Sequence, residues 1–242
     1  MPRLPRAILF DLDDTIISAY GRPELAWATV IAEFRTELRP LAVESVLSAI
    51  QDAALRFWAD AERHRAWRQK LRAARREIVN DAFAALTHQG AAIPARATQH
   101  AIADRFSDYR DEQMHIFPDA HQTIDTLRDQ GVRLALITNG DGEGQRAKIE
   151  RFDLAHRFHH IQIEGEHGFG KPEPRAYLHA LARLGVGAKD SWMVGDNLEW
   201  EVAAPQRLGI HAIWFDAHGA GLPKGSTIRP DRVVRKLSEL LE

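Results

Sequence analysis

The sequence predicts an α/β protein with a doubly wound, Rossmann-like parallel sheet as its core and an inserted α-helical cap. Two observations carry this prediction. Short apolar runs alternate with helical segments after Pro118, as in doubly wound folds. The stretch from about Pro23 to Gln113, by contrast, is nearly free of strand signals. The predicted α/β core therefore comprises residues 1–17 and 114–242, and the predicted cap comprises residues 18–113.

The first predicted strand is Ala7–Phe10, a continuous apolar run typical of a parallel strand covered on both faces. From about Pro23 to Gln113, apolar side chains recur at helical spacing. About four helices are expected there, with breaks at Pro40, Gly90 and Pro94. This segment interrupts the chain between the first strand and its crossover, so we expect it to form a lid over the carboxyl edge of the sheet.

Helices and strands alternate in the second half of the chain. Glycines that directly follow three of the predicted helices act as stop signals. The predicted helices are Asp119–Gln130, Gln145–Arg151, Pro174–Leu184 and Glu199–Leu208. The predicted strands are Arg133–Ile137, His159–Ile163, Ser191–Val194 and His211–Phe215.

Composition excludes several classes of function. The chain has 242 residues, of which 45% are hydrophobic, enough for a sizeable core. With 32 basic and 34 acidic residues, the net charge of -2 shows no overall bias toward nucleic acid or membrane. The absence of cysteine excludes disulfides, thiolate nucleophiles and cysteine-based zinc sites. We expect a cytoplasmic monomer or homodimer with no nucleic-acid or membrane partner.

Three acidic residues, Asp11, Asp13 and Asp14, follow the first apolar run within four positions. In doubly wound sheets, ligands bind just beyond the carboxyl ends of the strands, where these acids are expected. Like charges this close repel unless a cation or a raised pKa relieves them. The run therefore indicates a divalent metal site, an acid with a raised pKa, or both. The alternative is an Asp-rich surface turn.

Three more polar signals fall where this topology places a site. Thr138-Asn139-Gly140 follows a predicted strand, and its hydroxyl and N–H groups suit an anionic oxygen. Lys171 lies on a glycine-rich loop before a predicted helix, where an ammonium can balance a phosphate or the acids. Gly195-Asp196 ends another strand with a further carboxylate. Each also fits an ordinary turn, loop or helix N-cap, but the four signals together favour one site.

These motifs resemble those of the haloacid dehalogenase-like (HAD) hydrolase superfamily. The similarity is to its helical-cap phosphatase branch, which includes phosphoglycolate phosphatases, pyrimidine nucleotidases and acylneuraminate phosphatases. The matching residues are Asp11-Leu12-Asp13-Asp14-Thr15 for the first motif, Thr138 for the second, Lys171 for the third and Gly195-Asp196 for the fourth. The second acid of the fourth motif, usually Asp, is Glu201 here, which leaves its role open.

The resemblance implies a magnesium-dependent phosphatase that hydrolyses a small phosphorylated metabolite through an aspartyl-phosphate. Asp11 would be the nucleophile, and Asp13 the general acid and later the base, which needs a raised pKa. Mg²⁺ would be held by Asp11, by the backbone carbonyl of Asp13 and by Asp196. The groups expected to bind substrate and stabilise charge on the transferring oxygens are Thr138, the amide of Asn139 and Lys171.

Other activities on the same scaffold stay open. A phosphoryl mutase shares these motifs, and a non-catalytic phosphate-binding protein would use the same fold. A 2-haloacid dehalogenase releases a halide that needs no proton, so Asp13 favours a phosphate ester. A phosphonate-cleaving enzyme would need a cap lysine, and Lys70 is the only lysine there. We expect no catalytic role for Asp14, and we expect Thr15 to orient the loop.

The cap also contains a run of cations between Arg63 and Arg76, with no acid inside that span. One interpretation is a solvated helix whose charge is balanced by flanking Glu62 and Glu77. The other is that some of these cations bind a second anionic or aromatic part of the substrate. The twelve histidines show no pair at ligand spacing, and His159-His160 is expected to flank a strand.

Overall fold

The protein is described by a computed structural model that covers residues 4–19 and 21–242. It divides into two compact units. One unit contains Met1–Ser18 and His115–Glu242, and the other contains Ala19–Met114. The first unit is α/β and the second is helical.

The α/β unit is built on a six-stranded parallel sheet with the strand order β5-β4-β1-β6-β7-β8. Its strands are β1 Ala7–Phe10, β4 Arg133–Thr138, β5 His160–Ile163, β6 Ser191–Gly195, β7 His211–Phe215 and β8 Arg232–Val234. This confirms the predicted doubly wound, Rossmann-like fold. β1 lies between β4 and β6, so the strand order reverses beside it, and open α/β sheets bind ligands at that point.

Three short strands were not predicted. β8 is a three-residue edge strand that begins with Arg232, and β2 (Ile17–Ser18) pairs antiparallel with β3 (His115–Ile116). Segments of two or three residues are too short to show a strand period, so the sequence pattern could not reveal them.

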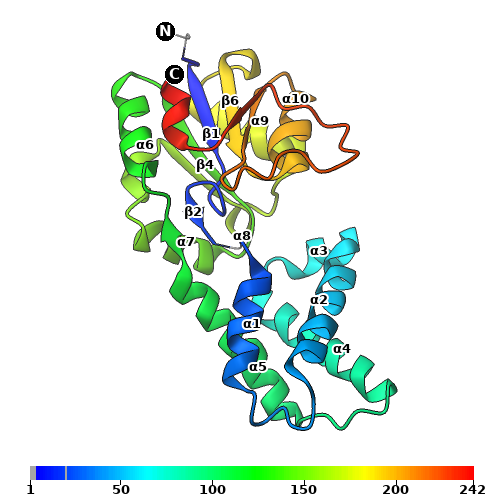
Figure 1. Cartoon of the computed structure of the whole chain (residues 1–242). Helices are drawn as coiled ribbons and strands as arrows, with labels where there is room; N and C mark the ends of the chain where they lie inside the picture. The colour runs from blue at the N-terminus through cyan, green and yellow to red at the C-terminus, as the bar shows by residue number, and fades with distance from the viewer. Residues whose placement is uncertain (1–3, 20) are drawn as a thin grey trace. The chain divides into compact units, whose positions relative to one another are not determined.

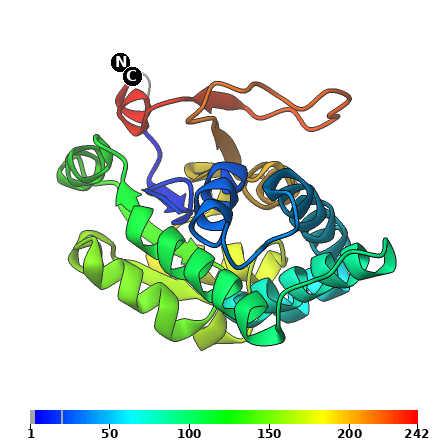
Figure 2. The ribbon, with the colours of Figure 1, turned by 60° about the horizontal axis from the view of Figure 1, so that its bottom comes forward.

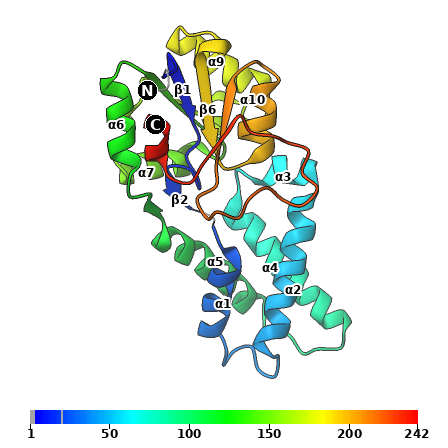
Figure 3. The same ribbon diagram turned by 45° about the horizontal axis from the view of Figure 1, so that its top comes forward.

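Helices cover both faces of the sheet. Along β1, Ala7 and Leu9 pack with Tyr177 and other residues of α9 (Pro174–Leu184), whereas Phe10 lies edge-to-face against Phe158 at 6.1 Å. Figure 1 shows α6 (Ala120–Asp129) and α9 on opposite sides of the sheet. The 3₁₀ helix η4 (Leu237–Leu241) packs beside α6, as Figure 3 shows. β1 is therefore buried on both faces, as its apolar composition predicts.

The predicted helix Glu199–Leu208 has a different form. Residues Leu198–Ala203 form a π-helix, η3, and only Ala204–Gln206 (α10) are α-helical. Pro205 has no backbone N–H and cannot donate the α-helical bond to the carbonyl of Glu201, which favours a wider turn. Two further helices of this unit are α7 (Gly142–Arg151) and α8 (Glu164–His167), and α8 was not predicted.

The helical unit contains five helices in its described residues rather than the four or so expected. They are α1 Pro23–Glu33, α2 Val43–Ala59, α3 Ala61–Trp67, α4 Leu71–His88 and α5 Arg96–Gln113. The additional break is at Asp60, between α2 and α3. The Asp60 side chain accepts a hydrogen bond from Arg63 N (2.6 Å) and so caps α3. No glycine or proline marks this break in the sequence. α1 and α5 lie side by side (Figure 2), and Trp27 stacks on Phe106 at 3.6 Å between them.

Acids of α5, which the sequence analysis did not consider, balance part of the arginine-rich run. Arg72 contacts Asp108 at 2.6 Å and Asp111 at 3.3 Å, and Arg76 makes a bidentate pair with Asp104. These pairs are exposed, so each contributes little to stability. No helix in the described part of the chain is long and apolar enough to cross a lipid bilayer.

Candidate active site

The polar residues singled out in the sequence gather at one edge of the sheet. Asp11 directly follows β1, Thr138 ends β4, and Gly195 ends β6. β1 pairs in parallel with both neighbours, with Phe10 opposite Leu136 and Val194. Since parallel strands present their carboxyl ends to the same edge, the sheet order brings these three loops together.

The loop after β1 is a tight turn that holds Asp11 in a buried position. Asp11 N donates to Val194 O (3.0 Å), and Ile16 N donates to Leu12 O (2.9 Å). Thr15 donates from Oγ1 to Asp11 Oδ2 at 3.3 Å. Asp14 has a φ of 57° and so adopts the left-handed conformation that Asp and Asn tolerate best. Thr15 therefore contacts Asp11 directly as well as belonging to the turn.

Lys171 is fully buried and places its ammonium group between two acids. Its Nζ contacts Asp11 Oδ1 and lies 2.7 Å from Glu201 Oε1. Burial lowers the pKa of Lys171, but the carboxylates of Asp11 and Glu201 outweigh it and the pKa is raised. The Asn139 side chain holds the backbone of Lys171 through two reciprocal bonds, Nδ2 to Lys171 O (2.8 Å) and Lys171 N to Oδ1 (2.9 Å).

Glu201, whose role the sequence left open, is a buried partner of this lysine. Its Oε2 also accepts a hydrogen bond from Asn197 N at 2.7 Å. Burial raises the pKa of Glu201 to about 7, although Lys171 opposes the shift. Gly195 makes room for the longer side chain, because a Cβ at that position would lie 2.0 Å from Glu201 Cγ.

We expect Gly195→Ala to lower the free energy of unfolding by about 1–3 kcal/mol, because the added methyl overlaps Glu201. Gly187→Ala is the matched control, since a Cβ there meets nothing within 4 Å and its φ is -82°. That control should be neutral or stabilising by up to about 1 kcal/mol. Urea unfolding of both variants measures the difference, and equal midpoints would contradict the tight fit at Gly195.

Two residues that the sequence analysis missed bind Asp13. Lys148 Nζ donates to Asp13 Oδ1 at 2.8 Å, and Gln145 Nε2 donates to Oδ2 at 2.9 Å. Gln145 also donates to Thr138 Oγ1, and so links the first and second motifs. Both residues belong to α7, which begins shortly after Thr138. Gln145 and Lys148 are three positions apart and therefore lie on the same face of α7, which starts near the carboxyl edge of the sheet. This spacing was the signal in the sequence that could have identified them.

The Thr138-Asn139-Gly140 turn is also braced from the neighbouring strand. Thr138 Oγ1 donates to Asn139 O at 3.3 Å, and Gly140 N donates to Glu164 Oε2 at 3.2 Å. Glu164 begins α8 directly after β5 and was not singled out in the sequence. The turn expected to bind an anion is thus tied to Lys171 on one side and to α8 on the other.

The carboxyl groups of Asp11, Asp196 and Glu201 repel one another at this edge of the sheet. Burial, reinforced by Glu201 and Asp11, raises the pKa of Asp196 well above its usual range. Burial also raises the pKa of Asp11, against the attraction of Lys171. One ammonium thus faces Asp11, Asp196 and Glu201, and carboxylate oxygens are the donors that Mg²⁺ prefers. The side chains of Asp11, Asp13 and Asp196 do not form a group with oxygens all within 4.8 Å in the described residues.

Comparison with models of known protein families identifies the family of this chain. The model of the haloacid dehalogenase-like hydrolases matches residues 5–209, which are most of the chain. The chain belongs to the haloacid dehalogenase-like hydrolase family. A phosphoserine phosphatase of Thermus thermophilus is 34% identical to this hydrolase over 189 residues, covering 77% of this chain and 67% of the relative.

Two further comparisons agree with this assignment. The N-acylneuraminate-9-phosphatase of Rattus norvegicus is 35% identical to this HAD-like hydrolase over 130 residues, covering 53% of this chain and 52% of the relative. The structure of YfnB from Bacillus subtilis, bound to magnesium, has a TM-score of 0.70 at 23% identity and covers 98% of this chain and 97% of that one. The first likeness supports a hydrolase of phosphate monoesters, and the second shows the shared fold.

A histidine cluster in this hydrolase lies apart from the motifs. His160, His167 and His179 each offer a ring nitrogen, and these nitrogens lie within 4.8 Å of one another. Burial, reinforced by His179, lowers the pKa of His160 to about 4. The sequence analysis found no such grouping, because the three residues are seven and twelve positions apart and meet only through the fold. His160 also lies within β5 rather than beside it.

Proposed function

We propose that this hydrolase is a Mg²⁺-dependent phosphatase that cleaves a small phosphorylated metabolite through an aspartyl-phosphate on Asp11. The observation that carries the proposal is the contact of buried Asp11 with Lys171, at the sheet edge where Asp13 and Asp196 also lie. The phosphatases among its relatives support the same reaction class. A cytoplasmic location, expected from the sequence, is part of the proposal.

In the first step, an Asp11 oxygen attacks the phosphorus atom in line with the ester oxygen. A bond forms between Asp11 and phosphorus, the bond from phosphorus to the ester oxygen breaks, and Asp13 donates a proton to the departing alkoxide. In the second step, water attacks the phosphorus and gives its proton to Asp13. Phosphate leaves, and the Asp11 carboxylate and protonated Asp13 are restored.

Neighbouring groups hold Asp11 and Asp13 in fixed orientations. Lys171 donates a hydrogen bond to Asp11 Oδ1 and Thr15 donates one to Oδ2, so both oxygens of the carboxylate are held in place. Lys148 and Gln145 hold both oxygens of Asp13 and so fix its direction. Thr138 and Lys171 supply donors for charge on the transferring oxygens.

Asp11, Asp196 and the backbone carbonyl of Asp13 are the groups that would hold Mg²⁺. Bound there, the ion would offset the repulsion between the carboxylates and stabilise negative charge on the phosphoryl oxygens. The excess of acids over Lys171 at this edge fits such a cation.

Asp13 also favours a phosphatase over a 2-haloacid dehalogenase. A halide leaves without a proton, whereas an alkoxide needs one, and Asp13 is the residue that would donate it in the proposed reaction. A phosphoryl mutase would use the same residues but return the phosphoryl group to a second hydroxyl of the substrate. Release of inorganic phosphate from a panel of phosphorylated metabolites distinguishes the phosphatase from the mutase.

Metal removal tests the proposal directly. Chelation should abolish hydrolysis of p-nitrophenyl phosphate, and added Mg²⁺ should restore it, because the acids at the sheet edge then regain their counter-charge. Initial rates are measured in chelator, in Mg²⁺, and in Mg²⁺ after chelator, with circular dichroism as the control for folding. Full activity in excess chelator would contradict the metal assignment, and no activity toward any phosphate ester in Mg²⁺ would contradict the phosphatase.

A further inference from the structure

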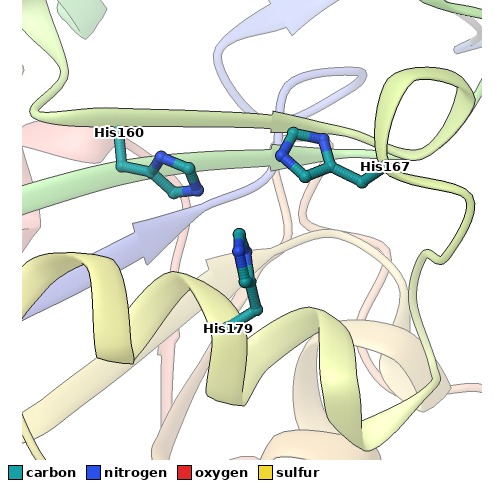
Figure 4. A group of neighbouring side chains, drawn as sticks. All are labelled: His160, His167 and His179. Carbon is teal, nitrogen blue, oxygen red and sulfur yellow. The ribbon is translucent and has the colours of Figure 1, made fainter.

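The histidine cluster has the geometry of a second metal site. His160 comes from β5, His167 from α8 and His179 from α9, and Figure 4 shows the three rings turned toward one another. Their ring centroids lie 5.4 to 6.1 Å apart. Within residues 4–19 and 21–242, this is the one group of three His, Asp or Glu side chains whose ligand atoms approach within 4.8 Å.

Hydrogen bonds fix which nitrogen of two rings carries the proton. His167 Nδ1 lies 3.1 Å from the carbonyl oxygen of Ile163, and His179 Nδ1 lies 2.8 Å from Gln162 Oε1. Both oxygens can only accept, so each Nδ1 donates and each Nε2 keeps its lone pair. The Gln162 amide is itself oriented, because its Nε2 donates to Ala176 O at 2.9 Å.

The third ring contains an unsatisfied atom. His160 Nε2 is buried and has no hydrogen-bond partner. A buried polar atom without a partner is unfavourable, and such an atom in a native protein calls for an explanation. A ligand held among the three rings would supply the partner that the protein does not.

We propose that His160, His167 and His179 bind a divalent transition-metal ion of the Zn²⁺ type, separate from the carboxylate site. Imidazole nitrogens suit Zn²⁺ and its neighbours Co²⁺, Ni²⁺ and Cu²⁺, whereas Mg²⁺ prefers oxygen ligands. Histidines that ligate metals usually donate their other ring N–H to a carbonyl or carboxylate oxygen, as His167 and His179 do here. Three imidazoles leave the fourth tetrahedral position to water.

The distances allow such a site after a small closure. Zn²⁺ lies about 2.0–2.1 Å from an imidazole nitrogen, which places two ligand nitrogens of a tetrahedral ion about 3.4 Å apart. In this structure the ligand nitrogens lie within 4.8 Å of one another. A pair at that limit must move closer by about 1.4 Å to bind one ion.

The site would join three elements that support the catalytic edge. α8 carries His167 and also Glu164, which accepts the hydrogen bond from Gly140 N. His167 is followed by the short loop to Lys171. A bound ion would therefore tie α8 to β5 and α9 and stabilise the native state by mass action.

Cobalt binding tests the proposal, because Co²⁺ with nitrogen ligands gives visible d–d absorption. The untagged full-length protein is titrated with Co²⁺ in saturating Mg²⁺, which occupies the carboxylate site. We expect one equivalent of four- or five-coordinate Co²⁺ and a rise in the melting temperature. His179→Ala and His167→Ala should each weaken binding by at least roughly tenfold, the lower end of the loss seen for outer-shell partners.

Two controls separate this site from others. His156→Ala removes an exposed histidine and should bind Co²⁺ like the wild type, and so should Asp11→Asn, which changes only the carboxylate site. Circular dichroism of the metal-free variants establishes that they fold. The proposal is overturned if the wild type gives no such spectrum, if the spectrum persists in both His179→Ala and His167→Ala, or if it is lost in Asp11→Asn.

Discussion

Asp11→Asn is expected to lower kcat for p-nitrophenyl phosphate by roughly 10⁴-fold or more, the scale seen when a catalytic nucleophile is removed. Asn has a similar shape but cannot supply the attacking carboxylate oxygen. Intact-protein mass spectrometry after brief exposure to substrate should therefore find no phosphoryl adduct on this variant.

Asp13→Asn should separate the two steps. Nitrophenolate leaves without a proton, so Asp11 should still be phosphorylated, whereas attack by water lacks its base. The adduct should accumulate above the wild-type level. Asp14→Asn is the matched control, since Asn tolerates the left-handed conformation of Asp14 and we expect no catalytic role there. An adduct on Asp11→Asn at the wild-type level would disprove Asp11 as the nucleophile.

Lys171→Met is expected to affect both activity and stability. Removing one partner from a buried ion pair typically costs about 3–5 kcal/mol, because the remaining charge is uncompensated. Here Asp11 and Glu201 would both lose their ammonium. The phosphatase activity of Lys171→Met should also fall, because Lys171 faces the transferring oxygens in the proposed reaction.

The loss of stability in Lys171→Met should depend on pH, because the carboxyl group of Glu201 titrates. The pKa of Glu201 is already raised to about 7, above the ordinary value of 4.5. An acid whose pKa is raised in the folded state stabilises it fully below the unfolded pKa, and this contribution is lost as the pH rises through the folded pKa. The deficit of Lys171→Met should therefore be largest above pH 7 and shrink toward pH 5, as measured by urea unfolding in Mg²⁺-free buffer.

A double variant provides the control. Lys171→Met with Glu201→Gln removes one of the two stranded charges and should recover part of the stability, but not the activity. Lys148→Met, which removes a partly exposed lysine from Asp13, should cost less stability than Lys171→Met. A deficit of Lys171→Met that does not vary with pH would contradict the assigned charges.

The sequence alone located most of the candidate site. Asp11 and Asp196 directly follow strands and Thr138 ends one, and the parallel sheet brings such strand ends to one edge. That inference needs only local pattern and topology. Helix Pro174–Leu184 was also correct to the residue, because Pro174 starts it and Gly185 ends it in the left-handed conformation.

Other features depended on the tertiary structure. Lys148 and Asp13 are 135 positions apart, and no local pattern indicates which side chains a helix brings to a strand end. The partnership of Glu201 with Lys171 follows from the π-helical turn and from the space above Gly195. The three histidines meet because β5, α8 and α9 pack together. Sequence periodicity shows which face of an element is buried, whereas contacts between distant side chains form only when the elements pack.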